Sequence, residues 1–204
     1  MAAVRVPMQV FRKSSPAPRL LLRLGRALLC LFVATPMGAT VAAQPASEYD
    51  VQAAYLYSFG KFVHWPDSAQ KNPSFDICIL GEDPFGGALD KLIANDNIDG
   101  RPIRKRNIGR TAEAGGCAIV YISDSEAGNL HRILAHIAGS GSLLVSSLPD
   151  FAQQGGMIQF VRHGDRVRFE VNLKAATQSH LVLSSELLKV AVRVTGMPQG
   201  GAAQ

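Results

Sequence analysis

Acidic side chains are missing from the first 43 residues of this sequence, although that segment carries six basic ones. An apolar stretch at residues 27–34 follows the basic residues, and small residues at 41–43 come next. A basic segment, an apolar segment and then small residues are the pattern of a secretory signal peptide. We therefore expect residues 1–43 to be a signal peptide that is cleaved before Gln44, and residues 44–204 to be the exported protein.

A long hydrophobic run is missing as well. The apolar stretch at residues 27–34 is far shorter than the roughly 18–20 residues that a membrane-spanning helix needs. This length disfavours the alternative of a retained membrane anchor. Because an arginine-rich leader with this cleavage pattern is typical of bacteria, we expect the exported protein to reside in the periplasm.

The exported part has no excess of positive charge, although the whole chain has a net charge of +5. Six of the 21 Lys and Arg residues lie in residues 1–43, whereas all 16 Asp and Glu residues follow that segment. The exported part therefore has nearly balanced charge. This balance removes the electrostatic argument for nucleic-acid binding.

Cysteine is scarce, with three residues in the chain. Cys30 lies in the expected leader, which leaves Cys78 and Cys117 in the exported part. An even number of cysteines in an exported chain favours a disulfide bond, and closing a loop of this length would stabilise the fold by about 4 kcal/mol. Two buried reduced thiols are the alternative. A metal site is disfavoured because no histidine lies close by in the sequence.

Patterns that carry catalytic or cofactor chemistry are also missing. The turn at residues 139–141 lacks the longer glycine pattern and the lysine of a phosphate loop. Ser123, Asp124 and His131 are residue types of a hydrolase, but their spacing supplies neither a positioned base nor an oxyanion hole. His131 and His136 would lie about 140° apart on a helix, too far around the axis to share one metal ion. We therefore expect no enzymatic activity, no cofactor and no metal site.

Short buried strands alternate with amphipathic helices along the exported part, a pattern typical of an α/β domain. Residues 157–161 and 167–173 flank His163-Gly164-Asp165 and predict an antiparallel hairpin near the C-terminus. We expect a single three-layer domain with a mostly parallel sheet flanked by helices. The expected helices are residues 48–63, 83–94, 124–137 and 184–194, and the expected parallel strands are residues 75–81, 101–108, 117–122 and 142–147.

The first expected helix has clear start and stop signals. Ser47 with Asp50 three residues later is a variant of the capping box, and Pro66 ends the pattern. Val51, Tyr55, Phe59 and Phe62 follow at helical spacing and predict the buried face.

Aromatic residues are few, at 7% of the chain, yet several gather in residues 55–65. A helix buries one face, and Tyr57 lies about 200° around the axis from Tyr55. Trp65 lies beyond the expected helix end. Tyr57 and Trp65 are therefore candidates for a dimer or partner surface, where exposed aromatic residues concentrate binding energy; core packing is the alternative.

One basic cluster stands out in the exported part, on the strand expected at residues 101–108. Arg101, Arg104 and Arg106 could meet an acidic partner. Charged side chains on an edge strand that discourage further strand pairing are the alternative interpretation.

Several segments of the sequence resemble the YfiR family of bacterial periplasmic proteins. The opening segments are residues 55–66 (YLYSFGKFVHWP) and 77–86 (ICILGEDPFG), and the closing segments are residues 155–158 (GGMI), 167–173 (VRFEVNL) and 184–188 (SSELL). They occur in the order expected for the family and cover the chain from about Ser47 to Val194. At Ser179-His180 the sequence departs from the pattern, since a small residue and a glycine are usual there.

The resemblance implies an α/β domain that forms a homodimer and acts by binding rather than by catalysis. It implies repression of an inner-membrane diguanylate cyclase through the periplasmic region of that enzyme, which lowers cyclic di-GMP. It also implies relief of repression by an outer-membrane-linked lipoprotein. A periplasmic receptor for a small ligand is the alternative function, because open α/β sheets commonly bind ligands beyond the carboxyl ends of their strands.

Overall fold

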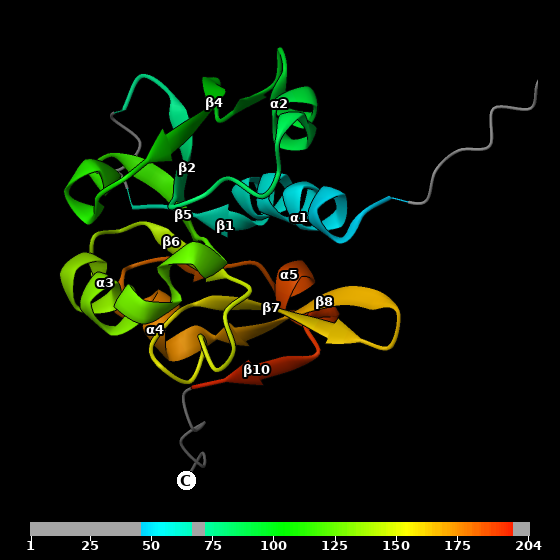
Figure 1. The fold of residues 1–204 in the computed structure, drawn as a ribbon, viewed down its shortest axis with the longest axis vertical. Coiled ribbons are helices and arrows are strands. Elements are labelled where there is room, and N and C mark those ends of the chain that lie inside the picture. The colour runs from blue at the N-terminus through cyan, green and yellow to red at the C-terminus, as the bar shows by residue number, and fades with distance from the viewer. Residues whose placement is uncertain (1–45, 67–71, 198–204) are drawn as a thin grey trace, which may run out of the picture. The chain divides into compact units, whose positions relative to one another are not determined.

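The computed structural model describes residues 46–66 and 72–197. The predicted signal peptide at residues 1–43 and its cleavage site lie outside the described residues. In the described part the chain forms one large sheet with helices packed against it (Figure 1).

Helix α1 spans Glu48–Phe62 and begins with the predicted capping box. The hydroxyl of Ser47 accepts a hydrogen bond from the backbone N–H of Asp50 at 3.2 Å, and the Asp50 carboxylate accepts one from the Ser47 N–H at 2.8 Å. These two bonds satisfy donors that a helix start otherwise leaves unpaired. The predicted start of the helix is confirmed.

The buried face of α1 differs from the predicted one. Phe59 is fully buried as expected, but Phe62 is 41% exposed, and Ala53 and Leu56 share the buried face with Phe59. Phe59 packs against the rings of Phe160 and Phe169 at 5.9 and 5.2 Å between centroids. The helix therefore turns Ala53, Leu56 and Phe59 towards the sheet, and leaves its last aromatic residue, Phe62, partly exposed.

The main sheet has eight strands in the order β10-β8-β7-β6-β5-β2-β4-β3. Five neighbouring pairs are parallel, and β7–β8 and β3–β4 are antiparallel. The α/β class with a mostly parallel sheet and a C-terminal antiparallel hairpin is thus confirmed. The strands are β2 Phe75–Leu80, β3 Asn97–Ile98, β4 Arg101–Ile108, β5 Cys117–Ile122, β6 Leu143–Ser146, β7 Ile158–His163, β8 Arg166–Asn172 and β10 Arg193–Thr195.

Helices connect the parallel strands. Helix α2 (Gly87–Ile93) links β2 to β4 and contacts α1, and helix α3 (Leu130–Ile137) links β5 to β6. These two connections run in opposite directions across the sheet, so right-handed crossovers place α2 and α3 on opposite faces. Strand β2 therefore stands beside the point where the winding of the sheet reverses.

Two helix starts differ from the prediction. The segment after Asp83 begins with a turn, in which the Asp83 carboxylate accepts a hydrogen bond from the Phe85 N–H at 2.9 Å, and α2 starts at Gly87. Similarly, Asp124–Asn129 is a 3₁₀ helix that precedes α3. At the first of these starts the Asp83 side chain competes with regular α-helical bonding.

The C-terminal segment differs most from the prediction. Helix α4 (Leu173–Gln178) follows β8 directly, and helix α5 (Ser185–Val190) ends before Val194. Val194 lies instead in β10, which pairs in parallel with β8. A second, two-stranded sheet joins β1 (Val63–His64) to β9 (Val182–Leu183). The expected helix at residues 184–194 is therefore wrong beyond its first half.

The two glycines before β7 are required for different structural reasons. Gly155 has a φ of +107°, a conformation that favours glycine. At Gly156 a Cβ atom would overlap the buried ring of Phe151, which lies in close contact with the backbone. Both glycines of the GGMI segment are therefore required by local geometry.

His180 occupies a position that favours glycine. It follows α4 with a φ of +61°, and the Leu181 N–H bonds to the Ala176 carbonyl while the His180 N–H bonds to Thr177, each at 3.0 Å. This pair of bonds is a Schellman motif, in which the residue at the His180 position is usually glycine. A glycine at this position would therefore have a physical reason.

Replacing His180 with glycine is expected to raise the free energy of unfolding by about 0.5–1 kcal/mol, because glycine relieves the left-handed conformation of a side-chain-bearing residue. Urea denaturation of the two proteins measures the difference. His163→Gly is the matched control, since His163 lies in β7 without a positive φ, and glycine in a strand is destabilising. A loss of stability in His180→Gly would contradict the expectation.

Candidate functional site

Cys78 and Cys117 form a disulfide bond, with Cα atoms 5.9 Å apart. They lie on the neighbouring strands β2 and β5, where Cys117 stands opposite Asp76. Cys78 is two residues further along β2, so its side chain lies on the same side of the sheet as that of Asp76. Both cysteines are buried. The predicted disulfide is confirmed, and it lies in the core of the domain.

Trp65 is buried, and its predicted exposure is wrong. Its side chain is 6% exposed, its indole N–H donates to the Ala118 carbonyl at 3.0 Å, and its ring packs edge-on against Phe75 at 5.0 Å. A residue held by both an apolar contact and a hydrogen bond cannot present its ring to a partner. Trp65 instead anchors the end of β1 to the start of β5.

Tyr57 is half-buried and takes part in a polar cluster on the outer side of α1. Its hydroxyl donates to the carboxylate of Asp96 and accepts from Lys61, whose ammonium group lies 3.3 Å from Asp96. The hydrogen bond from Tyr57 is the main reason that the pKa of Asp96 lies below its usual value, and the bond from Lys61 acts in the same direction. The cluster fixes Tyr57 to the loop after α2, and leaves only part of its ring for a partner.

The three arginines of the predicted cluster have different environments. Arg101 is buried, and its guanidinium lies 5.3 Å from the centre of the Phe75 ring. Arg106 is half-buried and pairs with Asp76 at 3.2 Å. Arg104 is exposed on β4. The structure therefore separates Arg101, which is packed in the core, from Arg104 and Arg106, which lie two residues apart on one side of β4. Of these two, Arg106 is held in an ion pair.

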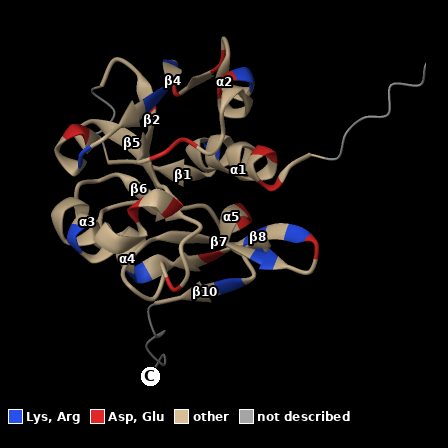
Figure 2. Cartoon of the chain, in the orientation of Figure 1, with Lys and Arg blue, Asp and Glu red and all other residues tan. Residues whose placement is uncertain are grey.

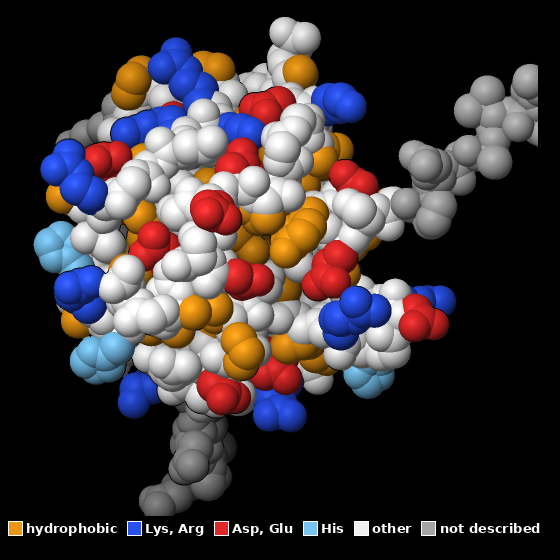
Figure 3. All heavy atoms as spheres, in the orientation of Figure 1, with side chains coloured by type: hydrophobic (Ala, Val, Ile, Leu, Met, Phe, Trp, Pro, Cys, Tyr) orange, Lys and Arg blue, Asp and Glu red, His pale blue; other side chains and the backbone are white. Residues whose placement is uncertain are grey.

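Basic side chains are also dispersed over the face of the molecule that Figure 3 draws. On the face drawn in Figure 3, Lys and Arg lie mainly near the periphery, whereas hydrophobic side chains gather near the centre among acidic ones. No single basic surface is visible on this face.

The small two-stranded sheet β1–β9 carries a surface that the sequence analysis missed. Its inner side is buried through Val63 and Leu183. On its outer side, His64 stands directly opposite Val182, and both are exposed. Phe62 precedes β1 and is also exposed. Phe62, His64 and Val182 form what we call the β1–β9 face.

Exposed apolar residues of this size are informative because they lose contact with water only when another molecule covers them. Val182 is 65% exposed and Phe62 is 41% exposed. The backbone N–H of Ser184 donates to the Phe62 carbonyl at 2.9 Å and holds the two segments together. The β1–β9 face is therefore a candidate docking surface, whose two segments are already held together in the fold. The sequence carries no signal for this face, because residues 62–63 and 182–183 are all apolar and two-residue strands are too short to show alternation.

The point where the winding of the sheet reverses is the usual ligand site of such folds. Here the carboxyl ends of β2 and β5 enclose a cavity of about 200 Å³ lined by Tyr49, Glu82, Asp83 and Asp124. That volume lies below the roughly 300 Å³ at which small-molecule pockets begin. The Phe85 ring packs edge-on against Tyr121 at 4.7 Å beside it.

Tyr121 itself belongs to a buried polar network below this cavity. Its hydroxyl lies 3.1 Å from the Ser147 hydroxyl and 3.4 Å from the Gln52 side-chain oxygen of α1. Burial raises the pKa of Tyr121 far above its usual value, so this hydroxyl stays protonated. The first turns of α1 thus fill much of the space that a ligand would occupy in an open α/β fold.

Within residues 46–66 and 72–197, no group of three or more His, Cys, Asp and Glu side chains has a geometry that could hold a metal ion. In the same residues, no helix is both long enough and apolar enough to cross a bilayer.

Comparisons with known proteins give one family match. No curated protein matches the chain. Among solved structures, the ABC domain in complex with L-Trp from Streptococcus pneumonia shares 11% identity and a TM-score of 0.48, covering 72% of this chain and 60% of that one. A conserved domain protein from Vibrio cholerae shares 9% identity and a TM-score of 0.48, covering 74% of this chain and 62% of that one. The chain thus spans about three fifths of the length of either structure.

The family model described as YfiR/HmsC-like matches residues 49–192. This range begins in the first turn of α1 and ends just before β10, so it includes the disulfide, the β1–β9 face and hairpin β7–β8. The protein belongs to the YfiR/HmsC-like family.

Proposed function

We propose that this protein is a periplasmic regulatory binding protein that represses an inner-membrane diguanylate cyclase through the periplasmic region of that enzyme, and so lowers cyclic di-GMP. The observation that carries the proposal is the YfiR/HmsC-like match over residues 49–192. Membership of this family supports a role in periplasmic regulation of cyclic di-GMP signalling. The Cys78–Cys117 disulfide fits an oxidising compartment.

The proposed mechanism is binding without catalysis. A periplasmic protein can act on a membrane enzyme by binding its periplasmic region, and its effect equals the difference in affinity for the inactive and active states of that enzyme. The β1–β9 face supports this mechanism because Phe62 and Val182 would leave water on contact with a partner. A homodimer, and an outer-membrane-linked lipoprotein that relieves repression, belong to the same proposal.

Deletion of the gene is expected to raise cyclic di-GMP and to favour biofilm over motility, because the cyclase is no longer held inactive. Deleting the cyclase gene as well is expected to cancel the rise. Cyclic di-GMP is measured in extracts of each strain, and re-expression of the wild-type protein is the control. An unchanged level in the single deletion, with protein and cyclase both present in the parent strain, would contradict repression and favour the receptor function.

A further inference from the structure

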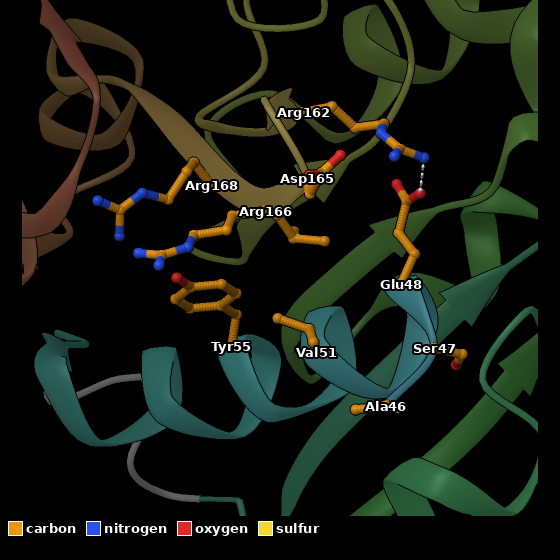
Figure 4. A pocket seen from close by; sticks show the side chains of 10 residues that line it. Ala46, Ser47, Glu48, Val51, Tyr55, Arg162, Asp165, Arg166 and Arg168 are labelled. Atoms are coloured by element: carbon orange, nitrogen blue, oxygen red, sulfur yellow. Dashed lines mark hydrogen bonds and ion pairs between the residues drawn. The ribbon is translucent and has the colours of Figure 1, made fainter. Parts of the chain in front are cut away.

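A cleft lies between the first turns of α1 and hairpin β7–β8, and shares no lining residue with the β1–β9 face (Figure 4). Its volume is about 460 Å³, within the range of pockets that hold small molecules. The residues relevant to binding are Val51 and Tyr55 on α1, and Arg162, Arg166, Val167 and Arg168 on the hairpin.

The three arginines of the cleft differ in their ion pairing. Arg162 pairs with Glu48 at 3.3 Å. Arg166 and Arg168 take part in none of the ion pairs found in the described part of the chain, and they lie two residues apart on β8. In Figure 4 the side chains of Arg166 and Arg168 extend in the same direction, and Tyr55 lines the same cleft. Two neighbouring positive charges without a counter-charge favour an anion between them.

Arg168 remains accessible to a ligand. The residue is half-buried, and its guanidinium nitrogens are not among the buried side-chain atoms of the described residues that lack a hydrogen-bond partner. Together with Arg166 it offers paired donors that match the oxygens of a phosphate or a carboxylate. The Tyr55 hydroxyl adds a further donor.

The rest of the cleft supplies an apolar wall that is already in place. The Tyr55 ring packs against Phe59, Phe160 and Phe169 at 5.3–6.0 Å between centroids, which limits its movement. Val51 and Val167 extend this wall. A ligand with an apolar body could lie on these residues without ordering the protein first, which favours affinity.

Acidic residues limit the type of ligand. Glu48 and Asp165 line the cleft on the side of Arg162, away from the Arg166–Arg168 pair in Figure 4. They would repel a second anionic group at that end. In Figure 2 the hairpin accordingly shows both blue and red segments.

We propose that this cleft binds a small organic anion, whose phosphate or carboxylate group lies on Arg166 and Arg168 and whose apolar body lies on Val51 and Tyr55. The site goes beyond the proposed function, because it gives the regulator a place for a chemical signal on residues other than those of the β1–β9 face. Hairpin β7–β8 and α1 both contribute to the site, so a bound anion links them.

Isothermal titration calorimetry of the mature protein tests the proposal. The probes are phenyl phosphate and phenylacetate, which share a ring and separate phosphate from carboxylate recognition, and benzyl alcohol is the neutral control. At least one anion is expected to bind one-to-one. Arg168→Gln is expected to weaken binding at least about tenfold, because it removes a charge-assisted pair of hydrogen bonds. Arg166→Gln is a second variant at an exposed residue.

Arg104→Gln is the matched control, since it removes the same charge from an exposed arginine on β4. It is expected to leave binding unchanged. Absence of binding by both anions at millimolar concentration would overturn the proposal. Equal binding of benzyl alcohol, or equal weakening by Arg104→Gln and Arg168→Gln, would overturn it as well. Because the assay contains no cyclase, its outcome is independent of the repressor function.

Discussion

Replacing Cys78 and Cys117 together with serine is expected to lower the free energy of unfolding by about 4 kcal/mol and to leave a folded protein. The disulfide closes a loop with a sequence separation of 39 residues, and the chain-entropy model assigns about 4 kcal/mol to a loop of this size. For a domain of this size the thermal midpoint should fall by roughly 8–16 °C. Urea denaturation and thermal unfolding measure the two quantities.

The fold should survive the loss because the core does not depend on the bond alone. Ile77, Ile79, Ile119 and Tyr121 are fully buried on the same two strands, and β2 pairs with β5 from Asp76 to Leu80. Since both sulfur atoms are buried, serine also introduces two buried hydroxyl groups, and the alanine pair at the same positions controls for that effect. Two free thiols in denatured, unreduced wild-type protein would refute the bond itself.

The disulfide also shows how far the sequence could predict a contact. An even number of cysteines in an exported chain favoured a disulfide bond, but the sequence did not show where the two residues lie in the fold. Two buried thiols therefore remained possible. The bond depends on β2 and β5 being neighbours, although β4 lies between them in the chain. That adjacency follows from the reversal of sheet winding, a property of the whole fold and not of either segment.

Elements with strong local signals were predicted well. The bounds of β4 and β5 match the expected ranges, and β2 ends one residue early. Short apolar runs limited by glycine, and a capping box before an amphipathic segment, are signals that neighbouring residues can carry. The local signal and the tertiary fold agree in these segments.

Elements that depend on distant partners were missed. Val194 has helical spacing from Leu187, but it lies in β10 because β8 offers an unpaired edge there. Strands β1 and β9 are two residues each and exist only through pairing with each other. Trp65 shows the same limit at a single side chain, since its partner Ala118 is 53 residues away. Tertiary pairing overrides local preference in all three cases.

The candidate surface was missed for a related reason. Tyr57, Arg101 and Arg106 were chosen by residue type, but each has partners inside the fold that were invisible in the sequence. Val182 carried no such signal, because one valine beside another apolar residue is typical of a core strand. It became a candidate only through its exposure of 65%.

Replacing Val182 with aspartate is expected to weaken binding to the periplasmic region of the cyclase by at least about 30-fold, if the β1–β9 face is the centre of the contact. An interface anchor contributes 2 kcal/mol or more, which corresponds to that factor, and an unpaired carboxylate in a dry contact adds a desolvation penalty. The fold should tolerate the change because the Val182 side chain is exposed, and the residue is held in β9 by backbone pairing opposite His64.

The matched control for this experiment is Leu92→Asp, which makes a similar change at a residue of α2 that is 39% exposed. Affinity is measured with the purified periplasmic region of the cyclase that the double deletion identifies, and repression is measured as cyclic di-GMP in the deletion strain that expresses each variant. Val182→Asp should fail in both assays, because loss of affinity for the inactive state removes the differential binding that repression requires. Leu92→Asp should behave as wild type in both. Full affinity and full repression by Val182→Asp would exclude the β1–β9 face as the docking surface, and would move the contact to another part of the molecule.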